Sequence, residues 1–164
     1  MLKWLNLKGI RTYMILSGDS IKNAIKKGDL VITPFDAKNL KGASYTFTLS
    51  SKLLIPKDAP LLKVDDTQDH EEIGIGFEGF VLNPGEFILG YTAEHLSLKN
   101  NFACLLSTRG SCTQVGLSVL LGSDFAEPDT NNPQMLEIYN VSKSPIKLEK
   151  GMKIVKGIFF QVEK

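Results

Sequence analysis

The stretch FACLLSTRGSCTQVGLSVLL (102–121) places a polar segment between two short apolar runs. Its first and last five residues have the length and composition of buried strands. Between them, Arg109 is followed by a glycine and by small hydroxyl residues. Glycine lets backbone amides approach an anion, Ser111 and Thr113 can donate hydrogen bonds, and arginine offers a two-pronged contact to a phosphate. A structural turn has the same composition, so the stretch alone leaves both interpretations open.

Short apolar runs bounded by turn residues recur on both sides of this stretch. Asn83–Gly85 is a typical turn, because Pro84 presets its φ and Gly85 supplies a positive φ, and Glu149–Gly151 is another expected turn. Many short strands with few helices predict a compact all-β sandwich or barrel. The other expected strands are Leu30–Ile32, Tyr45–Ser50, Leu53–Ile55, Phe80–Leu82, Phe87–Tyr91, Met135–Val141, Ile146–Leu148 and Ile154–Val162.

One helix is expected near the start of the chain. Ser17 is a suitable N-cap, apolar residues recur at helical spacing from Ile21, and Gly28 stands where a left-handed C-cap is needed. These signals predict a helix over 18–27. The polar and acidic segment 57–72 is expected to be irregular.

Length and composition fit one soluble domain with a real core. The chain has 164 residues, of which 43% are hydrophobic, and its net charge of +1 indicates no general affinity for nucleic acid. No apolar run approaches the ~18 residues of a membrane span. We therefore expect a cytoplasmic protein in which residues 1–13 are an N-terminal extension and 14–164 form a single domain.

Several common chemistries are excluded by the residues present. The only cysteines, Cys104 and Cys112, do not have the spacing of a zinc-dependent deaminase, so no zinc is expected. There is no phosphate loop of the G-x-x-x-x-G-K-[ST] type. His70 in the acidic segment and His95 in an expected polar turn are interpreted as surface residues, which leaves no Ser/His/Asp triad.

Several short motifs, in order along the chain, resemble those of the dCTP deaminase and dUTPase superfamily. Ser107–Gly116 resembles the Arg-Ser-Ser-Leu-Ala-Arg-x-Gly motif of dCTP deaminases. The resemblance covers roughly residues 14–162. The other matching segments are Met14–Ser17, Ile21–Phe35, Ala43–Tyr45, Asn83–Gly90, Leu136–Asn140 and Pro145–Ile154.

The resemblance implies a mostly β fold of the dUTPase-like β-clip type, a distorted barrel or sandwich with one N-terminal helix. It also implies a homotrimer with active sites between subunits. The implied reaction is zinc-independent deamination of dCTP to dUTP and ammonia, with Mg²⁺ bound through the nucleotide triphosphate. Glu137 matches the glutamate that activates water, and Arg109, Gly110 and Ser111 match phosphate contacts. The remaining expected substrate-binding residues are Cys112, Thr113, Gln114, Ser123, Glu127, Met135 and Leu136.

The chain also departs from the family pattern. Gln114 replaces the second arginine of the motif and cannot supply its charge or its guanidinium fork. Glu127 replaces an aspartate and adds a methylene, and the family's C-terminal tail is expected to be missing. Two alternatives therefore remain: a catalytically degraded paralog that only binds nucleotide, and a dUTP diphosphatase.

Overall fold

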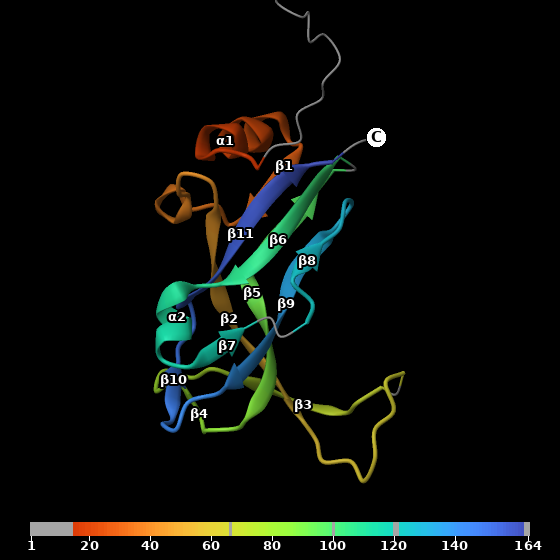
Figure 1. Cartoon of the computed structure of the whole chain (residues 1–164), viewed down its shortest axis with the longest axis vertical. Coiled ribbons are helices and arrows are strands. Elements are labelled where there is room, and N and C mark those ends of the chain that lie inside the picture. The colour runs from red at the N-terminus through yellow and green to blue at the C-terminus, as the bar shows by residue number, and fades with distance from the viewer. Residues whose placement is uncertain (1–14, 66, 100, 120–121, 163–164) are drawn as a thin grey trace, which may run out of the picture.

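The computed structural model describes residues 15–65, 67–99, 101–119 and 122–162, and strands dominate it (Figure 1). The mostly β prediction is therefore confirmed. Its elements are α1 (Gly18–Lys27), β1 (Leu30–Thr33), the 3-10 turn η1 (Ala37–Asn39), β2 (Tyr45–Pro56), β3 (His70–Gly74), β4 (Phe80–Leu82), β5 (Phe87–Leu98), β6 (Phe102–Thr108), α2 (Gly110–Gln114), β7 (Leu117–Val119), β8 (Phe125–Ala126), β9 (Asn131–Asn140), β10 (Ile146–Leu148) and β11 (Lys153–Gln161).

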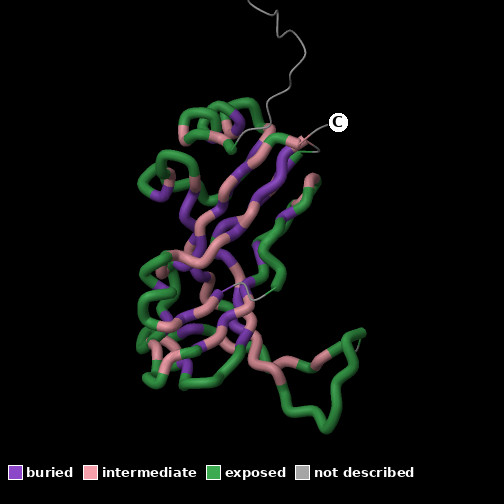
Figure 2. Tube along the Cα trace, viewed as in Figure 1, coloured by how far each residue is buried: buried purple, intermediate pink, exposed green. Residues whose placement is uncertain are grey.

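The strands form one large curled antiparallel sheet and a small two-stranded one. The large sheet has the order β7-β9-β5-β2-β11-β6-β8, with β1 added to β5 and β3 added to β2, and the small sheet pairs β10 with β4. The core lies along the strands, while α1, α2 and the β2–β3 loop are largely exposed (Figure 2). The largest fully buried side chains include Tyr45, Phe47 and Phe159.

Helix α1 has the bounds and the caps that the sequence predicts. The Ser17 hydroxyl accepts a hydrogen bond from the Ser20 amide at 3.2 Å, and Gly28 ends the helix with a φ of 69°. The expectation of a single helix is incomplete, because the polar stretch after Arg109 forms the short helix α2.

Strand β2 joins two predicted strands into one and changes partners along its length. Its first half pairs with β11 and its second half pairs with β5 and β3. The segment 57–72 was expected to be irregular throughout, but its last three residues belong to β3. Strand β3 pairs with Lys52–Pro56 of β2. This pairing holds the three residues in the sheet, because the backbone groups at the edge of β2 need hydrogen-bond partners.

Two neighbouring irregularities interrupt the centre of the sheet. The pairing of β2 with β5 shifts between Leu49 and Leu53, and that of β5 with β9 shifts between Tyr91 and His95. His95 therefore lies in a strand, where it pairs with Pro133, and the prediction that it lies in a polar turn is wrong.

Side chains take over backbone hydrogen bonds at these shifts. The buried Glu94 carboxylate accepts from the Thr48 amide at 2.9 Å and from the Thr48 hydroxyl at 3.0 Å. The Thr92 hydroxyl donates to the Glu94 carbonyl and accepts from the Gln134 amide. These hydrogen bonds satisfy backbone amides and a carbonyl that have no partner on the neighbouring strand where the pairing shifts.

The expected extension, residues 1–13, lies outside the described residues. Among the helices of the described ranges, none is both long and apolar enough to span a membrane.

Candidate active site

Glu137 lies on β9, the strand that pairs with β5 on one side and with β7 on the other. It is half-buried and stands opposite Leu89 of β5. Its Oε2 accepts a hydrogen bond from the backbone amide of Gly122 at 2.7 Å. Among the described residues, no hydrogen bond reaches Oε1. One oxygen of the carboxylate is thus fixed by the backbone, and the other is available to a ligand or a water molecule.

The backbone of Arg109 connects β6 to α2. Its amide donates to the Ile154 carbonyl at 3.0 Å, and its carbonyl accepts from the amides of Cys112 and Thr113 at 2.8 and 3.2 Å. The side chain is half-buried, and within the described ranges it has no carboxylate partner. The exposed residues of the expected phosphate motif are Gly110, Ser111, Thr113 and Gln114.

Thr108 ties this motif to the strands that hold Glu137. Its hydroxyl donates to the Val119 carbonyl and accepts from the Val119 amide. Val119 in turn pairs with Ile138, the neighbour of Glu137 on β9. The arginine motif and the glutamate therefore share one rigid framework, although no direct hydrogen bond joins them among the described residues.

The C-terminal end of the arginine motif packs against the residues that follow β9. Gly116 has a φ of 80°, and a Cβ there would lie 2.6 Å from the Ser142 side chain, so only glycine fits. Asn140 is fully buried; its Nδ2 donates to the Leu82 and Ser144 carbonyls, and its Oδ1 accepts from Ser142. All of its polar atoms are satisfied, which suits a structural role.

The structure separates the other predicted substrate-binding residues into two groups. Ser123, Glu127 and Met135 are exposed, with Ser123 directly after the glycine that binds Glu137. Cys112 and Leu136 are buried, so any contact they make with substrate would come from their backbone.

The Cys112 side chain is part of the core. Its Sγ lies 3.7 Å from the Lys153 carbonyl, to which it donates. Burial raises the pKa of the Cys112 thiol, and the nearby charge of Arg109 opposes that shift. A neutral, buried thiol is a poor nucleophile.

Sequence reasoning missed the two residues that organise this site, Gly122 and Thr108. Gly122 acts through its backbone amide, which no residue pattern reveals. Thr108 adjoins the arginine in the sequence, but its partner Val119 is 11 residues away, and only the fold brings the two together.

Comparison with known proteins identifies relatives along nearly the whole chain. A family model described as dCTP deaminase-like matches residues 15–162. A protein of Tropheryma whipplei (strain Twist) named "dCTP deaminase, dUMP-forming" is 35% identical over 154 residues, which are 91% of this chain and 79% of that protein. Proteins with the same name from Hydrogenobaculum sp. (strain Y04AAS1) and Corynebacterium glutamicum (strain R) are 29% and 33% identical, and the matches cover 92% and 91% of this chain and 84% and 82% of theirs.

Solved structures agree on the fold. The 2'-deoxycytidine 5'-triphosphate deaminase of Agrobacterium tumefaciens superposes with a TM-score of 0.73 at 20% identity, over 92% of this chain. This chain spans 49% of that longer chain. The dUTPase of Streptococcus mutans superposes with a TM-score of 0.50 at 13% identity, over 82% of this chain and 96% of the dUTPase. At these identities the likeness establishes the fold alone.

Proposed function

Because this chain belongs to the dCTP deaminase-like family, we propose that it hydrolyses dCTP to dUMP, ammonia and pyrophosphate. The observation that carries the proposal is the Glu137 carboxylate, which is half-buried and held at one oxygen by Gly122. The resemblance of short motifs in this chain to those of dCTP deaminases predicts dUTP as the product. The names of three relatives favour dUMP instead, which requires a second hydrolysis.

In the first step, Glu137 acts as the general base and then as the general acid. It accepts a proton from water as the water oxygen adds to C4 of cytosine. It then passes this proton to the amino group, the C4–N bond breaks, and ammonia departs. The hydrogen that remains on the added oxygen moves to N3, which gives the uracil carbonyl at C4. A carboxylate can perform both transfers only if it keeps one position, which the 2.7 Å contact with Gly122 provides.

The triphosphate is proposed to lie against the arginine motif. Arg109 has a guanidinium fork without a carboxylate partner in the described ranges, and Ser111 and Thr113 are exposed on α2 beside it. Arginine and hydroxyl donors suit phosphate oxygens. Magnesium arrives as part of the substrate, bound to the triphosphate, and no zinc takes part in the proposed reaction.

In the second step, Glu127 is proposed to orient a water molecule toward the α-phosphorus. This water adds as the bond to the bridging oxygen breaks, which releases pyrophosphate. Glu127 is exposed after β8, and its carbonyl accepts from the Thr130 amide in a turn. It stands where the family has an aspartate, and its extra methylene is expected to slow this step relative to the first.

The active form is proposed to be a homotrimer with a site between subunits. Support comes from exposed apolar residues beside the motif: Val115 is 55% exposed and Val141 is 61% exposed. The Val141 amide donates to the carbonyl of Gly116, so the two valines flank one anchor point. An interface at this point would remove both apolar side chains from water.

The test is to incubate the purified protein with magnesium and each deoxynucleoside triphosphate in turn, and to separate the products by chromatography. The proposal expects dCTP to be consumed and dUMP to appear. Accumulation of dUTP would limit the activity to deamination. Conversion of dUTP but not dCTP would make the protein a dUTP diphosphatase. No turnover by a folded protein would favour the nucleotide-binding paralog, which Gln114 in place of an arginine also favours.

A further inference from the structure

The acidic segment 57–72, called the arm below, runs from the end of β2 into β3 and stands off the body of the molecule (Figure 1). It carries six carboxylates and two lysines, which give it a formal charge of −4. Within it, Leu61, Leu62 and Val64 are 76%, 47% and 102% exposed. A partner that removes this apolar run from water gains free energy. The arm therefore offers apolar side chains with carboxylates beside them.

A hollow of complementary character lies beside the small sheet of β4 and β10. Its volume is about 380 Å³, and it lies between the loop 75–79 and the turn that follows β10. Phe77, which is fully exposed, and Lys150 both line it. A Cβ at Gly79 would lie 2.7 Å from the Lys147 side chain, so the stem of this second lysine packs against the same loop. An aromatic ring and two lysines thus meet at one hollow.

The chain around the hollow is basic. The segment 143–156 has five lysines and one glutamate, a formal charge of +4. Lys147 pairs with a neighbouring glutamate at 3.1 Å, whereas Lys150 is exposed and has no ion pair among the described residues. Asp58 and Asp65 of the arm are exposed as well, and within the described ranges neither has an ion pair. The two segments therefore carry equal and opposite charges, and no ion pair in the described part of the chain joins them.

We propose that the hollow of one subunit receives the arm of a second copy of this chain. An apolar side chain of the arm enters the hollow beside Phe77, and the carboxylates on either side of the apolar run pair with Lys147 and Lys150. This contact removes apolar groups of both subunits from water and brings opposite charges together, which steers association and fixes its register.

The proposed contact is heterologous, because the arm and the hollow are different surfaces. Each subunit uses its arm on one neighbour and its hollow on the other. Head-to-tail contacts of this kind close into a ring when the rotation between subunits allows it. The inference rests on the homotrimer of the proposed function and assigns to that ring a contact between named surfaces.

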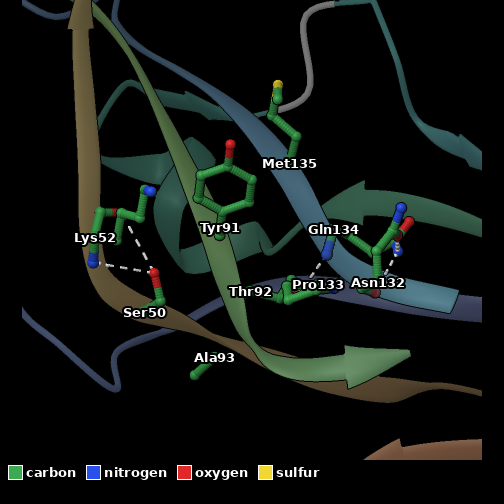
Figure 3. A pocket seen from close by; sticks show the side chains of 9 residues that line it. All are labelled: Ser50, Lys52, Tyr91, Thr92, Ala93, Asn132, Pro133, Gln134 and Met135. Atoms are coloured by element: carbon green, nitrogen blue, oxygen red, sulfur yellow. Dashed lines mark hydrogen bonds between the residues drawn. The ribbon is translucent and has the colours of Figure 1, made fainter. Parts of the chain in front are cut away.

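The contact is separate from the proposed active site. Met135, one of the expected substrate-binding residues, lines an open groove of about 620 Å³ on β2, β5 and β9 (Figure 3). Neither the apolar run of the arm nor any residue of the hollow lines this groove. Assembly and turnover can therefore be measured as independent properties of the same sample.

The experiment is sedimentation velocity of the full chain over a series of concentrations. The arm variant is Asp58→Lys with Asp65→Lys, and the hollow variant is Lys147→Glu with Lys150→Glu. Each is expected to raise the dissociation constant of the assembly about tenfold or more, because like charges then face each other. The combined variant carries all four reversals and has opposite charges again, so it is expected to associate within about threefold of the wild type.

Two further variants separate charge from burial. Lys22→Glu with Lys26→Glu is the matched control, because these exposed lysines lie on α1 at the other end of the molecule and the net charge changes as in the hollow variant (Figure 1). It is expected to leave association unchanged. Phe77→Ser removes the apolar ring from the hollow and is expected to weaken association about tenfold. Circular dichroism confirms that each variant is folded.

The proposed contact is overturned if wild-type assembly persists unchanged in the arm and hollow variants. It is also overturned if the combined variant associates no better than either of them, or if the control weakens association as much as the hollow variant does. A wild type that is monomeric at every concentration overturns the contact together with the proposed homotrimer. A wild type that assembles with the expected charge dependence but converts no nucleotide supports the contact and overturns only the proposed reaction.

Discussion

The two sides of strand β9 differ in what they contribute. On the inward side, Leu136 and Ile138 are fully buried and pack in the core. On the outward side, Met135 is 48% exposed and Glu137 is half-buried. Alternate residues of one strand thus specify either the fold or the chemistry. Substitutions on the two sides are expected to separate stability from activity.

The largest expected effect is on activity, at the outward Glu137. Glu137→Gln keeps the shape and can still accept from Gly122, but it cannot take a proton from water. Ammonia release from dCTP is expected to fall about a thousandfold or more, since general acid–base catalysis contributes ~10²–10⁴-fold. The measurement is a coupled ammonia assay, with the urea midpoint as the control. A variant that keeps wild-type turnover would remove Glu137 from the mechanism.

The next effect is on stability, at the inward neighbour. Leu136→Ala leaves a cavity in the core and is expected to lower the free energy of unfolding by about 2–5 kcal/mol. The matched control is Met135→Ala on the outward side, for which about 0.5 kcal/mol or less is expected. Urea denaturation at one fixed protein concentration compares the two. Equal losses in both variants would contradict the division between the two sides.

A smaller effect is expected at Glu94, which supports the interrupted sheet. Glu94→Leu leaves the Thr48 amide without its acceptor and should cost about 1–3 kcal/mol. Glu94→Gln can keep both bonds to Thr48, because its oxygen accepts from the amide and its nitrogen donates to the hydroxyl. It is therefore expected to be close to the wild type in stability at neutral pH.

The same residue gives a pH dependence of known sign. Burial raises the pKa of Glu94 above its ordinary value of 4.5, and hydrogen bonds from Thr48 oppose this shift. The folded protein therefore holds this proton more tightly than the unfolded chain. The contribution of Glu94 to the free energy of unfolding is greatest below pH 4.5 and falls as pH rises through the higher folded pKa. Glu94→Gln should remove this slope, and an unchanged slope would refute the assignment.

The smallest effect is expected at Gln114, which is exposed on α2. Gln114→Arg restores a guanidinium beside the proposed triphosphate site and should lower KM for dCTP a few-fold through charge-assisted hydrogen bonds. Gln114→Lys adds the same charge without the fork and serves as the comparison. Steady-state kinetics with dCTP gives the KM of the wild type and of both variants. A KM unaltered by either change would place the triphosphate away from Gln114.

The sequence predicts the features that depend on local patterns. Helix α1 with its caps and most strands follow from residue spacing alone. The phosphate-binding role of the arginine motif follows only from the resemblance to the family. The unpredicted features depend on residues far apart in the chain. The amide of Gly122 meets Glu137 across 15 residues, and Thr48 meets Glu94 across 46. Helix α2 was missed because five residues are too few to show a helical period.

The most direct test of the central claim is to run the reaction with dCTP in ¹⁸O-labelled water and to weigh the base of the product by mass spectrometry. Attack of water at C4 predicts one heavy oxygen in the C4 carbonyl of uracil and, if the second hydrolysis follows, another in the phosphate of dUMP. A uracil base without heavy oxygen at C4, or no conversion of dCTP by the folded protein, would contradict the proposed mechanism.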